Sequence, residues 1–216
     1  MSRPLTIGVP KGRILKSLLP FFQGIGIGVS NLLQEDRRLT RESDDGSIRF
    51  LLLKPDDVPT YVEYGVADLG VSGRDVLAER GYDLYQPVDL GIGRCQMVVA
   101  GPSGVTLGTR PRVATKFTKI ASEHFAKKGI QAEVIYVGGS VELAPLVGLA
   151  DVIVDIVESG ATLRENNLTV LETVCDISSV LIANRSLYKL RHAEISPFVE
   201  RLRQVVAERE RTSTQP

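Results

Sequence analysis

The sequence predicts an α/β fold in which mostly parallel strands are connected by helices. Short runs rich in Val, Ile and Leu recur along the chain, and segments with the apolar spacing of helices separate them. Apolar residues make up 43% and charged residues 24% of the 216 residues, which is enough for a sizeable buried core. This alternation is typical of sheets that helices cover on both faces.

The first part of the chain predicts four strands and two helices. Between Asn31 and Ser47 almost no residue is a core former, so we expect a polar excursion or a hairpin there. The expected strands are Leu5–Val9, Ile48–Leu53, Asp68–Val71 and Leu84–Leu90, and the expected helices are Ile14–Gln23 and Val58–Tyr64.

A second group of alternating elements begins near Gly91. The last helical pattern of the chain is Phe198–Ala207, with Ser196 as the expected N-cap and Pro197 at the first helical position. The strands of the second group are Cys95–Ala100, Arg112–Thr115, Ala132–Val137, Val152–Ile156 and Val180–Asn184, and its helices are Lys116–Lys127, Val141–Val147 and a short one from about Ser159.

Two groups of nearly equal size predict two α/β lobes with a cleft between them. We expect residues 1–91 plus 184–216 to form the first lobe and residues 92–183 to form the second. The chain would cross between the lobes twice, and connection by strands suits hinge closure better than a free tether.

The amino-acid composition limits which binding partners and which cellular location we expect. Lys plus Arg and Asp plus Glu both number 26, so no global field attracts nucleic acid or an anionic membrane. No apolar run has the length of a signal peptide or a membrane span, and we expect a cytoplasmic protein. Cys95 and Cys175 lack a CxxC or His partner pattern, which predicts buried thiols and no metal held by the protein alone.

The segment from Val152 to Leu163 joins an apolar strand to a turn of small residues. Small side chains allow an anion to approach the backbone, and successive N–H groups can then surround a phosphate. Asp155, on the strand before the turn, can accept hydrogen bonds from ribose hydroxyls. An ordinary strand-to-helix turn with a capping hydroxyl explains the same letters. The turn consists of Glu158, Ser159, Gly160, Ala161 and Thr162.

A longer stretch around this turn resembles the signature of the ATP phosphoribosyltransferase family. That signature has a Glu, then Gly-Leu-Ala-Asp, an apolar run to an Asp, and Ser-Gly-x-Thr-Leu. The resemblance continues through Val9–Arg13, Asp57–Asp75 and Val137–Pro145, and so covers nearly the full chain. The matching positions of the signature are Glu142, Gly148, Asp151, Asp155, Ser159, Gly160, Thr162 and Leu163.

The resemblance implies a fold, a reaction and a ligand for the turn. The fold is a pair of lobes similar to type II periplasmic binding proteins. The reaction transfers the phosphoribosyl group of phosphoribosyl pyrophosphate to N1 of ATP, the first step of histidine biosynthesis, with Mg²⁺ carried by the substrate. The Ser-Gly-x-Thr turn would bind the 5′-phosphate of the donor.

Cations near the N-terminus are candidates for the catalytic groups. Lys11, Gly12 and Arg13 follow the first strand, at the edge of an α/β sheet where ligands bind. Lys and Arg suit the polyphosphate of ATP or the departing pyrophosphate, although a solvated helix start is the plain alternative. Lys54 ends another strand and is a further candidate; relatives often carry Arg here, and a Lys keeps the charge but lacks the fork for bidentate binding.

Three further places are weaker candidates. Arg37 lies with Arg38 and Arg41 in the polar excursion, which could fold over bound phosphates or be a solvated charge run. The resemblance implies that the neighbourhood of Asp68 and Leu69 helps to hold the nucleotide, whereas a tight helix-to-strand connection is the alternative. Gly139 and Ser140 resemble a second anion-binding turn, and Glu142 behind them could act through water bound to magnesium.

The resemblance also implies a partner. Long relatives append a regulatory domain, whereas short ones work with a subunit similar to histidyl-tRNA synthetase, and this chain resembles the short form. One rival interpretation is a cytoplasmic two-lobed module that binds an effector without catalysis. Another is a phosphoribosyltransferase with a different base as acceptor.

Overall fold

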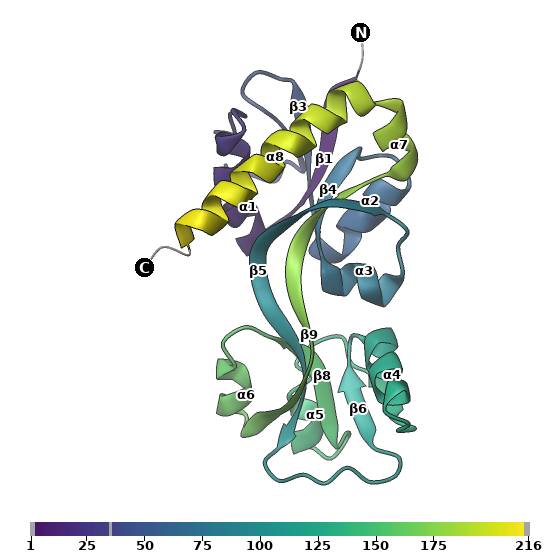
Figure 1. The fold of residues 1–216 in the computed structure, drawn as a ribbon. Coiled ribbons are helices and arrows are strands. Elements are labelled where there is room, and N and C mark those ends of the chain that lie inside the picture. The colour runs from purple at the N-terminus through teal and green to yellow at the C-terminus, as the bar shows by residue number, and fades with distance from the viewer. Residues whose placement is uncertain (1–2, 35, 214–216) are drawn as a thin grey trace. The chain divides into compact units, whose positions relative to one another are not determined.

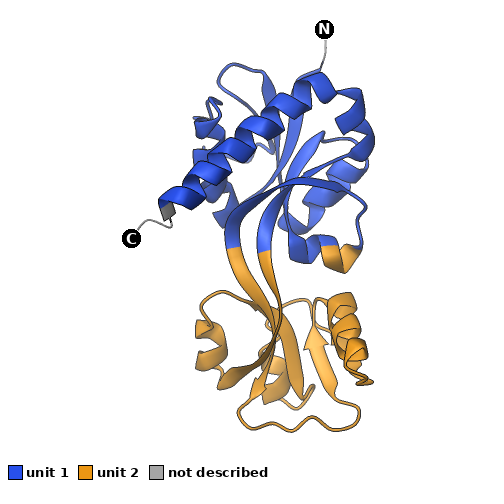
Figure 2. Ribbon diagram, viewed as in Figure 1, with its two compact units in different colours: residues 1–77, 81–93, 178–216 blue, residues 78–80, 94–177 orange. Residues whose placement is uncertain are grey.

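The computed structural model describes residues 3–34 and 36–213, which separate into two compact units (Figure 2). Unit 1 is formed by the described residues of Met1–Leu77, Gly81–Gly93 and Ser178–Pro216, and unit 2 by Ala78–Arg80 and Arg94–Ile177. The chain passes from unit 1 to unit 2 within the long strand β5 (Tyr85–Pro102) and returns within β9 (Leu168–Ala183) (Figure 1).

The unit boundaries differ from those expected from the sequence. The expected return to the first lobe is residue 184, but unit 1 already begins again at Ser178. The reason is strand pairing, because β9 runs antiparallel to β4 (Leu69–Gly73) from Ser179 opposite Gly73 to Ala183 opposite Leu69. The first crossing lies after Gly93 rather than residue 91.

Unit 1 is built on the sheet order β2-β3-β1-β4-β9. The central strand β1 (Leu5–Pro10) is parallel to β3 (Ile48–Leu53) and to β4, whereas β2 (Thr40–Glu42) forms an antiparallel pair with β3. The polar excursion therefore ends in a hairpin. The helices of this unit are α1 (Arg13–Gly24), the 3₁₀ turn η1 (Pro55–Asp57), α2 (Val58–Glu63), α3 (Arg74–Arg80), α7 (Arg185–Leu190) and α8 (His192–Ser213).

The main core of unit 1 lies between its sheet, α1 and α8. Phe22 of α1 meets Phe50 of β3 with ring centroids 5.2 Å apart, and Phe198 and Leu202 of α8 belong to the same buried cluster. Burial of these side chains, each worth about 1.5 to 3 kcal/mol, holds the last helix on unit 1. α8 thus packs on the first unit, as the sequence suggests.

The start of α8 was predicted wrongly. The helix begins at His192, so Ser196 is not its cap and Pro197 lies inside it. The buried stripe begins earlier than expected, at Ile195, which is fully buried. A separate helix that the sequence did not indicate, α7, precedes α8 and is capped by the Asn184 side chain, which accepts hydrogen bonds from two backbone N–H groups.

Unit 2 has the strand order β9-β5-β8-β6-β7. The strands β6 (Arg112–Thr115), β7 (Glu133–Tyr136) and β8 (Val152–Val157) are parallel neighbours, and β5 is antiparallel to β8. The helices are α4 (Thr118–Lys127), α5 (Leu143–Leu146) and α6 (Ala161–Glu165). α4 therefore begins two residues later than predicted, which leaves Lys116 in the connection after β6.

The two faces of the unit 2 sheet carry separate cores. One cluster holds Val113 and Phe125 beneath α4, and the other holds Ala114, Ile153 and Leu163 beneath α5 and α6. This division follows from the alternation of side chains along a strand. The same alternation indicates on which face of the sheet a polar side chain of a strand lies.

Two expectations about individual segments were wrong. The predicted strands on either side of Gly91–Gly93 are one continuous strand, β5, and the segment before Val180 is also strand. Cys95 is half-buried, but Cys175 is exposed rather than buried. None of the helices in the described part of the chain combines the length and hydropathy that a membrane crossing requires.

Candidate functional site

The turn after β8 is an exposed loop with a left-handed glycine. Gly160 has φ +69° and precedes the first residue of α6, a conformation that costs an L side chain about 1 to 2 kcal/mol. Glu158, Ser159 and Thr162 are exposed. The sequence pattern thus folds locally as expected, with small residues that leave the backbone accessible.

A cation of α6 lies against this turn. The Arg164 Nη1 donates to the Ser159 carbonyl at 3.0 Å, and the same nitrogen is 3.1 Å from the position that a Cβ on Gly160 would occupy. Arg164 was not among the predicted site residues. Its position in the first turn of a helix that directly follows a glycine turn could have indicated it. The turn therefore combines backbone donors with a guanidinium.

Asp155 lies on β8 just before the turn and is half-buried. Burial raises the pKa of its carboxyl above the ordinary 3.8, and the neighbouring negative charge of Glu142 adds to this effect, whereas Lys116 opposes it. Glu142 and Lys116 are thus both close enough to act electrostatically on Asp155.

The turn after β7 occupies the same edge of the sheet. Gly138, Gly139 and Ser140 are exposed, and Ser140 has the uncommon positive φ of 49°. The N-cap residue of α5 is Glu142, whose side chain makes no capping hydrogen bond, and the Leu143 N–H donates to the Ser140 carbonyl at 3.1 Å.

The carboxyl ends of three adjacent parallel strands meet in unit 2. The β6, β7 and β8 connections all leave at this edge, where α/β sheets bind ligands. The predicted candidates of the second lobe come together here. They are Asp155, Glu158, Ser159, Gly160, Ala161 and Thr162 from β8 and its turn, and Gly139 and Ser140 from the turn after β7.

Unit 1 brings two predicted cations together at its own carboxyl edge. The backbone N–H of Lys11 donates to the Leu53 carbonyl at 2.9 Å, so Lys11 and Lys54 follow neighbouring positions of β1 and β3. Gly12, with φ +89° and ψ −140°, makes the sharp turn into α1 that places Arg13 at its first position. Both lysines and Arg13 are exposed.

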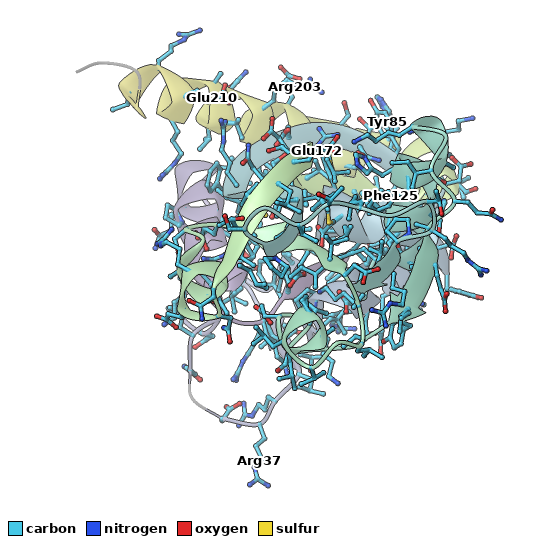
Figure 3. All side chains as sticks on the ribbon, turned by 90° about the horizontal axis from the view of Figure 1, so that it is seen from below. Arg37, Tyr85, Phe125, Glu172, Arg203 and Glu210 are labelled. Atoms are coloured by element: carbon cyan, nitrogen blue, oxygen red, sulfur yellow. The ribbon has the colours of Figure 1, made fainter. Side chains whose placement is uncertain are left out.

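The polar excursion divides its arginines between two roles. Arg37 projects into solvent from the tip of its loop (Figure 3). Arg41 is buried instead, and its guanidinium donates to Asp36 and to the Gln34 carbonyl, with Nη1 2.9 Å from Oδ2 of Asp36. Arg41 thus organises the loop, and Arg38 also pairs with Asp36, its Nε lying 3.6 Å from Oδ2. Of these three arginines, Arg37 is the one that extends from the loop into solvent.

Asp68 and Leu69, which were expected to help hold the nucleotide, do not expose their side chains. Both side chains are fully buried, and the Asp68 carboxylate accepts hydrogen bonds from Arg3, Arg191 and the Thr6 N–H. Leu69 belongs to the core of unit 1. Their place in the sequence match reflects the packing of β4, because an ion pair without exposed surface has no oxygen left for a substrate.

Fold and site together define an α/β protein in which parallel strands end at an edge with exposed small-residue turns, the kind of edge that binds anionic ligands. The model of the family described as ATP phosphoribosyltransferase (HisG) matches residues 54–204. The chain belongs to the ATP phosphoribosyltransferase family, whose members transfer the phosphoribosyl group of phosphoribosyl pyrophosphate to N1 of ATP at the entry to histidine biosynthesis.

Relatives of the same description cover almost the whole chain. The ATP phosphoribosyltransferase of Sorangium cellulosum is 63% identical over 96% of this chain and 98% of its own length. That of Burkholderia vietnamiensis is 48% identical over 93% of this chain and 95% of its own length. These matches leave the interpretation as an effector module without support.

Solved structures agree with the fold expected from the sequence. A chain of the ATP phosphoribosyl transferase (HisG:HisZ) complex from Thermotoga maritima is similar with a TM-score of 0.82 and 36% identity, covering 94% of this chain and 99% of that one. The periplasmic aliphatic sulphonate binding protein SsuA of Escherichia coli has a TM-score of 0.59 at 17% identity, over 98% of this chain and 76% of that one. The likeness to periplasmic binding proteins is confirmed.

Proposed function

We propose that the turn of residues 158–162 binds the 5′-phosphate of phosphoribosyl pyrophosphate and that Asp155 accepts hydrogen bonds from its ribose hydroxyls. The observation that carries this assignment is the left-handed Gly160 between two exposed hydroxyl residues, with the Arg164 guanidinium 3.0 Å from the loop carbonyl. Backbone N–H groups, hydroxyls and a guanidinium are the donors that phosphate prefers.

The cations of unit 1 are assigned to the polyphosphates. Lys11, Arg13 and Lys54 lie exposed at one sheet edge, and Arg37 extends from its loop. We assign to this group the triphosphate of ATP and the departing pyrophosphate. A guanidinium binds phosphate oxygens in pairs and an ammonium binds them as a point charge, so Arg13 and Arg37 are the better clamps.

The reaction needs positioning and charge more than acid or base chemistry. N1 of adenine attacks C1 of the ribose, that carbon inverts, and pyrophosphate leaves, while the ribose becomes similar to an oxocarbenium ion. The nucleophile needs little deprotonation. The residues must therefore hold two polyanions in line and stabilise the charge on the leaving group.

Magnesium bound to the pyrophosphate supplies part of that charge stabilisation. Mg²⁺ prefers oxygen ligands and keeps several waters, and the carboxylates of Asp155 and Glu142, close enough to influence one another, fit contacts to such waters. Both residues lie on the same edge as the proposed phosphate turn.

A regulatory partner and a cytoplasmic location complete the proposal. The similar chain from Thermotoga maritima comes from a HisG:HisZ complex, which supports a subunit of the HisZ kind for this chain too. We expect weak catalysis by the chain alone and inhibition by histidine only with that subunit. The cytoplasm is where ATP is available as a substrate.

One assay tests the function and the assignment together. The protein is mixed with ATP, phosphoribosyl pyrophosphate and Mg²⁺, with and without the partner subunit, and the release of pyrophosphate and the formation of an adenine ribosylated at N1 are followed. We expect both products. Pyrophosphate without ribosylated ATP would point to another base as acceptor, and no product even with the partner would contradict the proposal.

A further inference from the structure

Lys116 lies beside Asp155 at the carboxyl edge of unit 2. The parallel strands β6 and β8 pair Val113 with Val152 and Ala114 with Ile153. The hydroxyl of the next residue, Thr115, donates to the Val154 carbonyl at 2.6 Å, which keeps the alignment as β6 ends. One residue further, the same register brings Lys116 next to Asp155.

Asp155 belongs to the face that carries the proposed phosphate turn. Ile153 is buried in the same cluster as Leu163 of α6. Side chains two residues apart on a strand share a face, so Asp155 continues this row on β8, and the row ends before the turn of residues 158–162 that leads into α6. Lys116 is the first residue after β6, beside this end of the row.

The ammonium of Lys116 is available for a ligand. It lies 4.6 Å from the centroid of the Phe117 ring, and no salt bridge to it occurs among residues 3–34 and 36–213. A half-buried ammonium held over an aromatic face retains three donors that neither the ring nor a carboxylate occupies. Its electrostatic influence on Asp155 supports their proximity.

We propose that Lys116 is a further binding residue for the phosphorylated ribosyl donor, contacting a phosphate oxygen beside the sugar that Asp155 holds. This inference rests on the proposed role of residues 158–162. Without such a cation, the site would present two carboxylates, Asp155 and Glu142, to a polyanionic ligand. A lysine beside Asp155 lowers the repulsion and adds a charged hydrogen bond.

Substitution of Lys116 tests the proposal directly. Lys116→Met should raise the dissociation constant for phosphoribosyl pyrophosphate at least tenfold by calorimetry and leave that for ATP within twofold. Lys116→Arg should recover most of the affinity. The matched control is Lys119→Met, because Lys119 is an exposed lysine three residues along the same segment.

A double variant distinguishes a direct contact of Lys116 with the donor from simple compensation of the carboxylate charges. A chain carrying Asp155→Asn and Glu142→Gln lacks the two carboxylates whose repulsion Lys116 could reduce. We expect Lys116→Met to weaken donor binding there by a similar factor. If the factor falls to one, Lys116 acts only on the carboxylates and the proposal is wrong.

If Lys116→Met does not fold, a measurement on the unaltered protein tests the same contact. Reductive methylation followed by mass spectrometry should show Lys116 protected by phosphoribosyl pyrophosphate and Lys119 unprotected. Equal labelling of Lys116 with and without the donor would overturn the proposal. If Thr162→Val weakens binding while Lys116 does not respond, the turn stands and this inference fails; if neither responds, the proposed site itself is wrong.

Discussion

The guanidinium of Arg191 donates from Nη1 to Oδ2 of Asp68 at 2.7 Å, across 123 residues of sequence. Arg3 binds the other carboxylate oxygen at the same distance, and none of the Asp68 side chain is exposed. This cluster ties the beginning of β1 and the connection before α8 to β4. It gives Asp68 a structural role in place of the expected contact with the nucleotide.

Asp68→Ala should destabilise the protein by about 1 to 3 kcal/mol, because the largely buried Arg191 keeps only the Glu194 carboxylate and the buried Thr6 N–H loses its acceptor. Urea unfolding measures the loss. Glu200→Ala is the control, since its pair with Arg203 is half exposed and worth about 0.5 kcal/mol. Unchanged stability with weaker ATP binding would return Asp68 to the substrate site.

Arg13→Ala should slow turnover with little change in stability, because Arg13 is exposed at the first position of α1. Loss of one transition-state contact corresponds to about 2 to 4 kcal/mol, or roughly 30- to 800-fold in kcat. Lys16→Ala, an exposed cation of the same helix, is the control. Equal activities of the two variants would remove Arg13 from the mechanism.

Thr162→Val should raise the KM for phosphoribosyl pyrophosphate by about 10- to 100-fold, the value of one hydrogen bond to a charged group. The hydroxyl is exposed, so the change removes a donor with little effect on packing. Steady-state kinetics with each substrate varied in turn provide the measurement. An effect confined to the KM for ATP would mean that the two substrates have been assigned the wrong way round.

Gly160→Ala and Gly104→Ala form a matched pair in unit 2. Their φ angles are +69° and +74°, so each alanine should cost about 1 to 2 kcal/mol of stability. Around Gly104 the space is open, whereas a Cβ on Gly160 meets Arg164 at 3.1 Å in the turn. Only Gly160→Ala should therefore weaken donor binding; comparable binding by both variants would contradict a role for the turn.

Asp155→Asn should raise the melting temperature at pH 7 while it lowers activity. Burial raises the pKa of this carboxyl, with Glu142 adding to the rise and Lys116 opposing it. The folded state therefore favours the protonated acid. The resulting stability is fully present below the ordinary pKa of 3.8 and is lost as the pH rises through the raised value.

The asparagine mimics the protonated acid, so its advantage should be largest at neutral pH and shrink toward pH 4. Melting curves of the two proteins across this range measure the difference. A difference in melting temperature that stays constant at every pH would show that the stabilisation comes from packing rather than from ionisation.

Local chemistry was enough to predict much of the site. Gly160 and its small neighbours indicate a turn that exposes its backbone, and Lys11-Gly12-Arg13 follows a strand that apolar residues define. Both patterns lie within a few consecutive residues, where spacing alone constrains the backbone. The sequence could not show that Arg41 is buried, because its partner Asp36 depends on how the loop folds.

The α/β class, the positions of most strands along the chain and the exposed turn of residues 158–162 follow from the sequence itself, since apolar periodicity and turn chemistry act over neighbouring residues. Pairing between distant segments was decided only by tertiary structure. It extended β5 and β9 into single long strands, buried Asp68 under Arg191, and aligned Lys116 with Asp155. The free energy of these contacts depends on which strands become neighbours, and no local pattern of residues encodes that choice.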